Sequence, residues 1–455
     1  MQAALAELRG LLGDRLTTAP AVLDHHAQSE SWAGARAPDA VAFPRTTAEV
    51  AALAEICARH RVPMTGWGAG TSLEGHALAV QGGLTVDFRD MAEVIEVRAE
   101  DMVAVVQPGI TREALNAWLR DTGLFFPVDP GANASLGGMA STRASGTAAV
   151  RYGTMRDNVL GLTVVLAGGE VIRTGSAAPK SSAGYDLTGL FVGAEGTLGL
   201  ITELTLRLHG QPEAVSTATC AFPAMEAAVD CVIATIQTGI PMARIEFLDE
   251  ATVAACNAFT GLNLPLSPLL LVEFHGSPAA VSEDAARFAA IAEGFGATGI
   301  GRAEKAEDRA RLWKMRHNAY PAILASRPGA RAIVTDSCVP ISALAQAVAE
   351  TRADIAASGI PGPILGHVGD GNFHAILLID PARPDELTTA KALATRMAER
   401  ALRLGGTITG EHGIGFGKLP LMAAEHGAAW GVMGQIKRAL DPMNLMNPGK
   451  MVPQT

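Results

Sequence analysis

The chain has 455 residues, with 36 basic and 46 acidic side chains and a formal net charge of −10. This length exceeds what one hydrophobic core usually supports, so we expect at least two domains. The acidic balance argues against a general nucleic-acid-binding surface, which needs clustered basic side chains. Apolar residues make up 48% and charged residues 18%, which is typical of a globular protein and excludes extended disorder.

Cysteine spacing and apolar run length exclude two further classes. The five cysteines lie far apart without a CxxC pair, so they predict neither a disulfide framework nor a zinc-thiolate site. Residues 1–16 are typical of an amphipathic helix and not of a signal peptide. No apolar run reaches the roughly 18 residues of a membrane span. We expect a cytoplasmic protein; peripheral attachment to the inner face of a membrane stays open.

Short helices and strands alternate from the N-terminus. A helix is expected over residues 46–60, where Thr46 and Glu49 have the spacing of a capping box. Strands are expected at residues 62–66 and 84–88, on either side of a glycine-rich loop.

The pattern continues to about residue 210. Residues 94–109 predict two further strands, and a helix follows over 111–123, with Thr111 as its N-cap and Gly123 at its C-terminus. Residues 162–174 predict a hairpin around a two-glycine turn.

After residue 210 longer strands alternate with amphipathic helices, which predicts an open sheet with helices on one face. The expected strands are 243–249, 268–276, 331–340 and 374–380, and the clearest helices are 340–358 and 383–403. The fold class is therefore α+β, with two domains at 1–210 and 211–455. We expect the last ~30 residues to return to the first domain.

A glycine loop in the first domain predicts an anion-binding turn. The segment TGWGAGTSLEG (65–75) places Gly66, Gly68 and Gly70 at alternate positions and follows them with Thr71 and Ser72. Backbone amides and hydroxyls arranged in this way suit a pyrophosphate. A simple glycine-rich turn is the alternative. The spacing is not the nicotinamide-type fingerprint, and no GxxxxGK[ST] motif is present.

Two later segments are also rich in small residues. PVDPGANASLGGMASTRASG (127–146) contains far more small side chains than packing requires, and FVGAEGTLGLITELTL (191–206) puts small residues before an alternating strand. A large flat cofactor lying against the backbone would explain both compositions.

These three segments, in this order, resemble the flavin-binding domain of the vanillyl-alcohol-oxidase and p-cresol-methylhydroxylase (PCMH) superfamily. The SLEG ending of the first segment and the later GEHGIG resemble the branch of D-lactate dehydrogenases, D-2-hydroxyglutarate dehydrogenases and glycolate oxidase subunits. The resemblance runs from about residue 38 to the closing DPMNLMNPGK. It implies a PCMH-type FAD-binding domain and a substrate domain built on an antiparallel sheet with helices.

The resemblance also implies positions for the flavin. The first loop would hold the pyrophosphate, and the other segments would line the flavin or the adenine by their backbone. No histidine lies within this loop, so the FAD is expected to be non-covalent. The residues are Gly66, Trp67, Gly68, Ala69, Gly70, Thr71, Ser72, Pro130, Gly131, Gly138, Ser141, Gly146 and Ile201.

Two glycine-framed loops in the second half carry candidate metal ligands. GHVGDGNFH contains His367 and His374, and the glycines between them predict a turn that lets both imidazoles converge. TITGEHGIG supplies Glu411 and His412. Two histidines and a carboxylate match a catalytic metal site, although a single histidine is more often a structural residue.

The resemblance assigns roles to these four residues. His367, His374 and Glu411 would bind a divalent metal, and His412 would be the catalytic base. Zinc and manganese are the favoured metals, and the ligand set alone does not choose between them. A Lewis acid on the substrate hydroxyl would lower its pKa enough for a histidine to accept the proton near neutral pH.

A carboxylate substrate calls for a guanidinium, whose planar fork can form two hydrogen bonds with it. Arg316 lies on a predicted helix, where a solvated face is the alternative, and the resemblance implies that it binds the substrate carboxylate. Asn372 is a weaker polar candidate. Relatives specific for 2-hydroxyglutarate carry a lysine where this chain has Val334 and Thr335. This departure favours a monocarboxylate such as D-lactate, although Arg331 could still reach a second carboxylate.

Several alternatives stay open. The same residues suit a glycolate oxidase subunit or a D-2-hydroxyglutarate dehydrogenase. A reductase or an alkyl-transferring relative would not need the metal set, and a non-catalytic flavin-binding subunit would be expected to lose it. The electron acceptor, whether a cytochrome, a quinone or an electron-transferring flavoprotein, leaves no trace in the sequence. The oligomeric state is equally open, with a homodimer as one option.

Overall fold

The computed structural model describes residues 1–29, 37–303 and 305–453, which form two compact units. Unit 1 comprises Met1–Ser145, Gly153–Gln211 and Glu411–Thr455, and unit 2 comprises Gly146–Tyr152 and Pro212–Gly410. Apart from the segment 146–152, the chain enters unit 2 after Gln211 and returns to unit 1 at Glu411. The sequence predicts these two points at 210 and about 30 residues before the end. The short excursion of residues 146–152 into unit 2 has no signal in the sequence.

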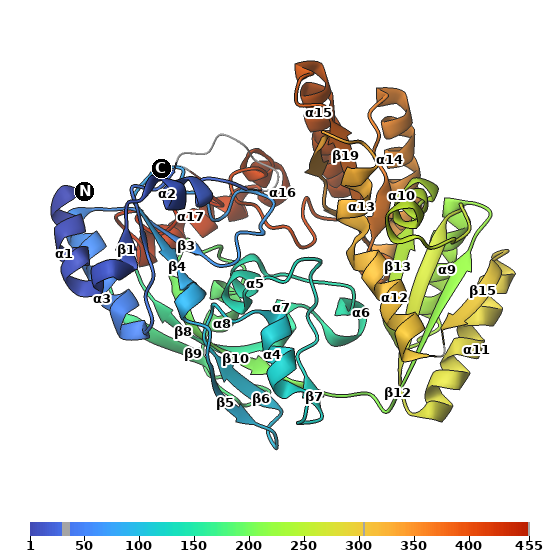
Figure 1. Ribbon diagram of the computed structural model, residues 1–455, viewed down its shortest axis with the longest axis horizontal. Coiled ribbons are helices and arrows are strands. Elements are labelled where there is room, and N and C mark those ends of the chain that lie inside the picture. Colours follow the sequence, from blue (N-terminus) through green and yellow to red (C-terminus); the bar gives the residue numbers. More distant parts are fainter. Residues whose placement is uncertain (30–36, 304, 454–455) are drawn as a thin grey trace. The chain divides into compact units, whose positions relative to one another are not determined.

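Unit 1 is built on three sheets (Figure 1). A four-stranded sheet has the order β1-β2-β4-β3, a five-stranded sheet has the order β5-β6-β10-β8-β9, and β11 pairs with β7. The strands are β1 (Leu16–Thr17), β2 (Ala40–Ala42), β3 (Met64–Trp67), β4 (Leu84–Asp87), β5 (Val94–Arg98), β6 (Val103–Val106), β7 (Leu124–Phe125), β8 (Val159–Val165), β9 (Val171–Gly175), β10 (Leu200–Arg207) and β11 (His209–Gly210).

The helices of unit 1 pack on these sheets around two apolar cores. They are α1 (Gln2–Leu12), α2 (Pro20–His25), α3 (Thr47–His60), α4 (Arg112–Leu119), α5 (Leu136–Thr142), α7 (Met155–Asn158), α8 (Leu187–Phe191), α16 (Met422–His426) and α17 (Ala428–Leu440). Because β8 and β9 pair in register around the turn at 168–169, the predicted hairpin is present.

Two predicted helix ends differ from the structure. Thr46 caps α3 by accepting a hydrogen bond from the Glu49 amide, as expected. The Glu49 carboxylate, however, binds Arg15 and the Arg45 amide, so it forms a tertiary ion pair. The helix α4 begins after Thr111 but ends at Leu119, and Gly123 lies in the following turn with a φ of +73°.

Unit 2 is an antiparallel sheet with helices, as predicted. Its strand order is β15-β12-β14-β13-β18-β19-β16, with β17 also paired to β19. The strands are β12 (Ala214–Ala221), β13 (Met242–Leu248), β14 (Leu269–Gly276), β15 (Thr298–Ala303), β16 (Arg331–Val334), β17 (Ser337–Cys338), β18 (Ile364–Gly366) and β19 (Asn372–Ile379). The helices are α6 (Ala149–Tyr152), α9 (Met225–Gln237), α10 (Glu250–Thr260), α11 (Pro278–Gly294), α12 (Ala306–His317), α13 (Ala319–Ala325), α14 (Leu344–Ser358) and α15 (Pro384–Arg403).

Helices pack on both faces of this sheet, so the prediction of one covered face was wrong. One apolar core joins α9, α11, α14 and α15 to the first face, and a second joins α10, α12 and α13 to the other. Successive side chains of a strand point to opposite faces. Phe247 and Phe373 therefore enter the first core, whereas Glu246, Asn372 and His374 belong to the second face.

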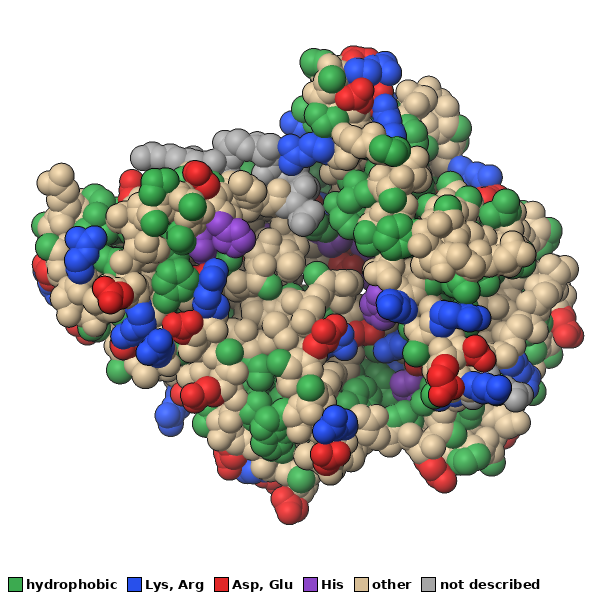
Figure 2. Space-filling view, in the orientation of Figure 1, with side chains coloured by type: hydrophobic (Ala, Val, Ile, Leu, Met, Phe, Trp, Pro, Cys, Tyr) green, Lys and Arg blue, Asp and Glu red, His purple; other side chains and the backbone are tan. Residues whose placement is uncertain are grey.

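On the face drawn in Figure 2, basic and acidic side chains are interspersed and form no broad patch of one sign. Among the described residues, no helix is both long and apolar enough to cross a membrane. All five cysteines are free thiols, and only Cys338 is even partly exposed.

Candidate functional site

The first glycine loop lies directly against the second small-residue segment. A Cβ added to Gly68 would lie 2.0 Å from Ser135 Oγ and 3.9 Å from Gly138 Cα, so a side chain at this position would separate the two segments. Gly70 has a φ of +71°, which favours glycine, and an added Cβ would meet the Trp67 ring. The loop therefore presents its backbone, as an anion-binding turn must.

The third small-residue segment joins the same wall. The Glu195 amide donates to Ser141 O at 2.8 Å, and the Gly193 amide donates to Ala140 O at 2.9 Å. Ile201 follows on β10 and is buried. The three segments, which lie far apart in the sequence, thus meet in unit 1.

Two predicted flavin contacts need separate comment. Gly131 is exposed, and a Cβ added to it would have no atom within 4 Å, so the protein's own packing does not require a glycine there. Gly146 is buried but opens the 146–152 segment of unit 2, whereas the other predicted flavin residues belong to unit 1.

Unit 1 contains a buried polar network that was not predicted from the sequence. The Glu195 carboxylate accepts hydrogen bonds from the Ile414 and Gly415 amides at 2.7 and 2.8 Å, and its Oε1 lies 3.3 Å from His76 Nε2. Burial alone would raise the pKa of Glu195, but the charge and hydrogen bond of His76 and the two amides outweigh it, and the pKa falls below its usual value. Glu195 therefore anchors the backbone that follows His412.

The C-terminal segment closes this network. Lys450 donates to His76 O at 2.7 Å, to Asn447 Oδ1 at 2.5 Å and to Leu78 O. Asn447 donates to His76 O and Glu195 O at 2.9 and 2.7 Å. Burial lowers the pKa of Lys450 to about 7, against the opposing attraction of Glu195. The motif DPMNLMNPGK thus has a structural role in unit 1.

His367 and His374 come together in unit 2. The short 3-10 turn η4 (Val368–Asp370) separates β18 from β19, and it brings the two rings to a centroid distance of 5.7 Å at an interplanar angle of 82°. Gly371 has a φ of +75° at the end of this turn, and an added Cβ would lie 2.1 Å from Val339 O. The glycines therefore permit the convergence that the sequence predicted.

Each of these rings is anchored through Nδ1. His367 Nδ1 lies 2.7 Å from Glu246 Oε1, and His374 Nδ1 lies 3.0 Å from Thr335 O. With Nδ1 engaged by an acceptor, Nε2 is the nitrogen of each ring that a metal would take. The two buried imidazoles thus fit half of a histidine-and-carboxylate metal centre.

Arg316 shares the Glu246 carboxylate with His367. Its Nε and Nη2 atoms both donate to Glu246 Oε2, at 2.8 and 2.6 Å. The side chain is only 8% exposed, so the alternative of a solvated helix face is wrong. One edge of the guanidinium is committed to Glu246, and the Nη1 side is the edge that a substrate carboxylate would meet.

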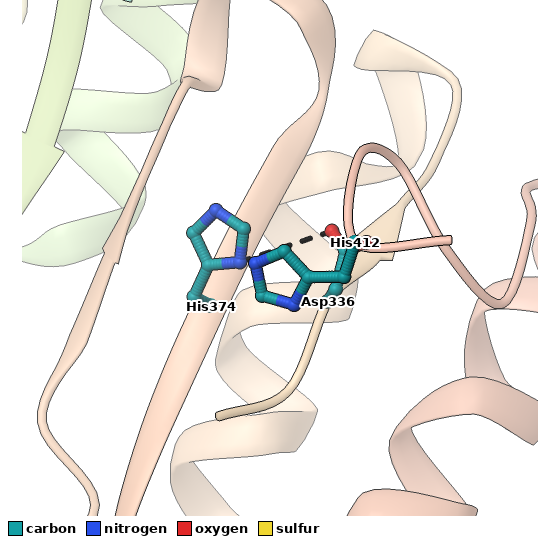
Figure 3. A group of neighbouring side chains, drawn as sticks. All are labelled: Asp336, His374 and His412. Carbon is teal, nitrogen blue, oxygen red and sulfur yellow. Dashed lines mark ion pairs between the residues drawn. The ribbon is translucent and has the colours of Figure 1, made fainter. Parts of the chain in front are cut away.

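Asp336 fixes the loop that leads to GEHGIG. Its Oδ1 lies 3.8 Å from His374 Nδ1, and Figure 3 shows this pair, while its Oδ2 accepts a hydrogen bond from Thr409 Oγ1 at 2.7 Å. Gly410 lies against Asn372, because an added Cβ would be 2.4 Å from Asn372 Nδ2. Glu411 and His412 follow as the first residues of the last segment of unit 1.

Asn372 itself is 4% exposed, and its Oδ1 has no hydrogen-bond partner among the described residues. A buried amide oxygen without a partner is costly. Its place beside Gly410 and on the same face as His374 keeps Asn372 a candidate for a polar ligand contact.

The sequence analysis missed Glu246, Asp336 and Glu195. Glu246 had a usable signal, since it lies between Ile245 and Phe247 in the segment ARIEFLD, and a charged group at a buried strand position requires partners. Asp336 and Glu195 lie in short polar segments, where nothing in the sequence separates them from solvated residues.

Comparison with protein families agrees with this geometry. Residues 38–175 match the model of an FAD binding domain, and residues 211–451 match the C-terminal domain of FAD linked oxidases. The chain belongs to the FAD-linked oxidases. It is an FAD-dependent oxidoreductase, and the resemblance found in its motifs is confirmed.

Relatives of this FAD-linked oxidase align over nearly its whole length. A probable mitochondrial D-lactate dehydrogenase of Danio rerio is 50% identical over 456 residues, covering 99% of this chain and 92% of the relative. A mitochondrial D-lactate dehydrogenase [cytochrome] of Arabidopsis thaliana is 43% identical, covering 99% and 80%. A glycolate oxidase subunit of Bacillus subtilis is 37% identical, covering 91% and 89%.

Solved structures with low sequence identity share the fold. p-Cresol methylhydroxylase gives a TM-score of 0.81 at 18% identity, covering 99% of this chain and 96% of the other. Alkyldihydroxyacetonephosphate synthase gives 0.79 at 20% identity, covering 98% and 86%. The predicted fold, an FAD-binding domain with an α+β second domain of antiparallel sheet, is thereby confirmed.

Proposed function

We propose that this FAD-linked oxidase oxidises a small D-2-hydroxy acid, D-lactate by preference, to the 2-oxo acid with the help of a divalent metal. The observation that carries the proposal is the pairing of His367 and His374 beside the buried Arg316 on one face of the unit 2 sheet. Two relatives are named D-lactate dehydrogenases, and this chain covers at least four fifths of the length of each. Their names support the choice of substrate.

His367, His374 and Glu411 would hold the metal, which would supply Lewis acidity to the substrate hydroxyl. Chain connectivity supports the inclusion of Glu411, which directly follows Gly410. Gly410 packs on Asn372, two residues before His374 on β19, and consecutive Cα atoms are only about 3.8 Å apart. Thr409 is held by Asp336, which also pairs with His374. Zinc and manganese both accept such a set.

Each reacting group of the substrate would meet one group of the chain. The Nη1 edge of Arg316 would bind the carboxylate, and Asn372 would provide a further polar contact. His412 would accept the hydroxyl proton as the C–O double bond forms, and the hydride from the same carbon would leave to the bound FAD. One proton and one hydride account for the two electrons of the oxidation.

The wall of unit 1 would hold the FAD without a covalent bond. The loop of residues 66–72 would receive the pyrophosphate, and Pro130, Gly131, Gly138, Ser141 and Ile201 would contact the rings through their backbone, with Gly146 at the edge of the set. Glycine positions where a Cβ would collide with the protein, such as Gly68, leave backbone amides as the groups that face a ligand.

The region before DSCVP supports a monocarboxylate. Thr335 is buried, its Oγ1 is bonded to the Ala375 backbone, and its carbonyl accepts from His374 Nδ1, so no cation stands there. Arg331 is exposed at the far end of β16, about 13 Å away along the strand at ~3.3 Å per residue. A second substrate carboxylate would therefore meet no cation at the positions of Val334 and Thr335.

Anaerobic mixing of the FAD-loaded protein with candidate acids tests the proposal. D-lactate is expected to bleach the flavin absorbance faster than glycolate, and D-2-hydroxyglutarate is expected to be slowest. Bleaching by none of the three acids would refute 2-hydroxy-acid oxidation. Preference for glycolate would instead favour the second candidate, a glycolate oxidase subunit, which the Bacillus subtilis relative supports.

We also propose that a separate protein or quinone receives the electrons. The Arabidopsis thaliana relative carries cytochrome in its name, so cytochrome c is the first acceptor to test. Reduction of cytochrome c by substrate-reduced protein, measured without oxygen, would support it. Peroxide formation at the rate of turnover would contradict a dehydrogenase and indicate an oxidase.

A further inference from the structure

Glu246 is a fully buried carboxylate beside the candidate metal ligands. It lies on β13, on the sheet face that also carries His374, and its side chain has no exposed surface. A buried anion without partners would be strongly destabilising. Its surroundings must therefore supply both charge and hydrogen bonds.

Both carboxylate oxygens of Glu246 are engaged, and by different groups. Oε2 takes the Nε and Nη2 atoms of Arg316 at 2.8 and 2.6 Å, and Oε1 lies 2.7 Å from His367 Nδ1. The guanidinium balances the charge. The imidazole can then donate its Nδ1 proton while remaining neutral, which is the form that ligates a metal.

We propose that Glu246 is a positioning residue that couples metal binding to substrate binding. The inference rests on the proposed function, because it takes His367 as a metal ligand and Arg316 as the substrate's guanidinium. The Glu246 carboxylate fixes the tautomer and the orientation of the His367 imidazole. By binding one edge of the Arg316 guanidinium, it also determines which edge would meet the substrate. Displacement of Glu246 would thus disturb the metal site and the carboxylate site together.

A purely structural role for Glu246 would be to hold α12 on the sheet, and the chain contains a matched control for that role. Glu273 lies on β14 next to β13 and is also buried. It binds α12 through Trp313 Nε1 at 2.5 Å, and it also accepts from Thr217 and His275 at 2.7 and 2.8 Å. None of these partners is a candidate metal ligand. Glu273 therefore anchors the same helix without reaching His367.

The experiment compares Glu246→Gln and Glu273→Gln in the FAD-loaded protein. Metal affinity is measured by competition with a coloured chelator for Mn²⁺ and for Zn²⁺, and kcat and KM are measured with D-lactate. Glu246→Gln is expected to lower metal affinity about 10- to 100-fold, as loss of an outer partner of a ligating histidine does, and to raise KM. Glu273→Gln is expected to leave metal affinity unchanged, and both variants are expected to retain FAD.

Further variants separate the inference from the function on which it rests. Glu246→Asp keeps the charge on a shorter side chain and is expected to give a metal affinity between those of the wild type and Glu246→Gln; it also serves if Glu246→Gln does not fold. Wild-type metal affinity in Glu246→Gln, or an equal loss in Glu273→Gln, would overturn the positioning role. If His367→Ala also kept wild-type metal affinity, the proposed metal site itself would fail.

Discussion

The two units build their candidate sites in opposite ways. In unit 1 the proposed flavin wall consists of glycines and small residues whose backbone would face the ligand, and Glu195, His76 and Lys450 form a separate buried network. In unit 2 the polar face consists of long side chains that hold one another in place, such as Glu246 with Arg316 and His367.

The difference shows how each kind of site tolerates change. A wall made of backbone is insensitive to most side chains but cannot accept a Cβ at its closest contacts. A face made of linked side chains can lose one group and leave its partner buried and unsatisfied, so single substitutions should affect several functions together. Substitutions in the flavin wall of unit 1 should therefore change flavin binding, whereas substitutions in the polar face of unit 2 should change turnover and leave flavin binding intact.

The largest effect is expected from His412→Ala. Loss of the proposed base should lower turnover about 100- to 10,000-fold, the usual range for general base catalysis. Flavin content, measured by absorbance, should not change, because His412 is outside the flavin wall. Normal turnover in the variant would reject His412 as the base.

Removal of the metal should be nearly as severe. Dialysis against a chelator is expected to reduce the turnover of D-lactate about 100-fold, since Lewis-acid assistance is worth several kcal/mol. Flavin absorbance should be retained, and added Mn²⁺ or Zn²⁺ should restore activity. If protein shown to be metal-free turned over D-lactate at the full rate, the proposed metal site in unit 2 would be refuted.

Two glycine substitutions test the wall. Gly68→Ala should lower the free energy of unfolding by about 1–3 kcal/mol, as overpacking typically does, and should also reduce FAD content, because the new Cβ would collide with Ser135. Gly131→Ala meets no protein atom, so its stability should match the wild type.

Gly131→Ala should nevertheless weaken FAD binding if the flavin lies against that backbone. Titration of apo-protein with FAD, followed by fluorescence, measures the change. An unchanged dissociation constant would show that Gly131 does not contact the flavin, and it would leave the assignment of Gly68 intact.

The smallest effect concerns Lys450. Burial lowers its pKa in the folded protein to about 7, against about 10.4 in an unfolded chain. Between these values the unfolded chain binds more protons, so stability should rise with pH over that window. From pH 7 to pH 9 the free energy of unfolding of the wild type should rise by about 2 kcal/mol more than that of Lys450→Met. Urea unfolding at both values measures this, and parallel slopes would contradict a buried, easily deprotonated lysine.

The order and type of elements followed from the sequence because they depend on local physics. Alternation and capping predicted a helix at 46–60, a hairpin at 162–174 and strands of the second domain, and the structure has these elements with slightly different ends. The glycine loop and the GHVGDGNFH turn were recognisable because special backbone geometry restricts the residues that fit it. The FAD-binding family followed from the same motifs.

Tertiary structure alone decided which distant side chains share a buried space. Glu246 and His367 are 121 residues apart, and Glu195 and Ile414 are 219 apart. No local pattern records such pairs, because a buried charge is stabilised by whatever the fold brings to it. Helix coverage of both sheet faces was missed for the same reason, since a strand buried on two sides loses the alternation that marks a solvent face. Periodicity therefore fixes the elements, whereas long-range packing fixes the partners.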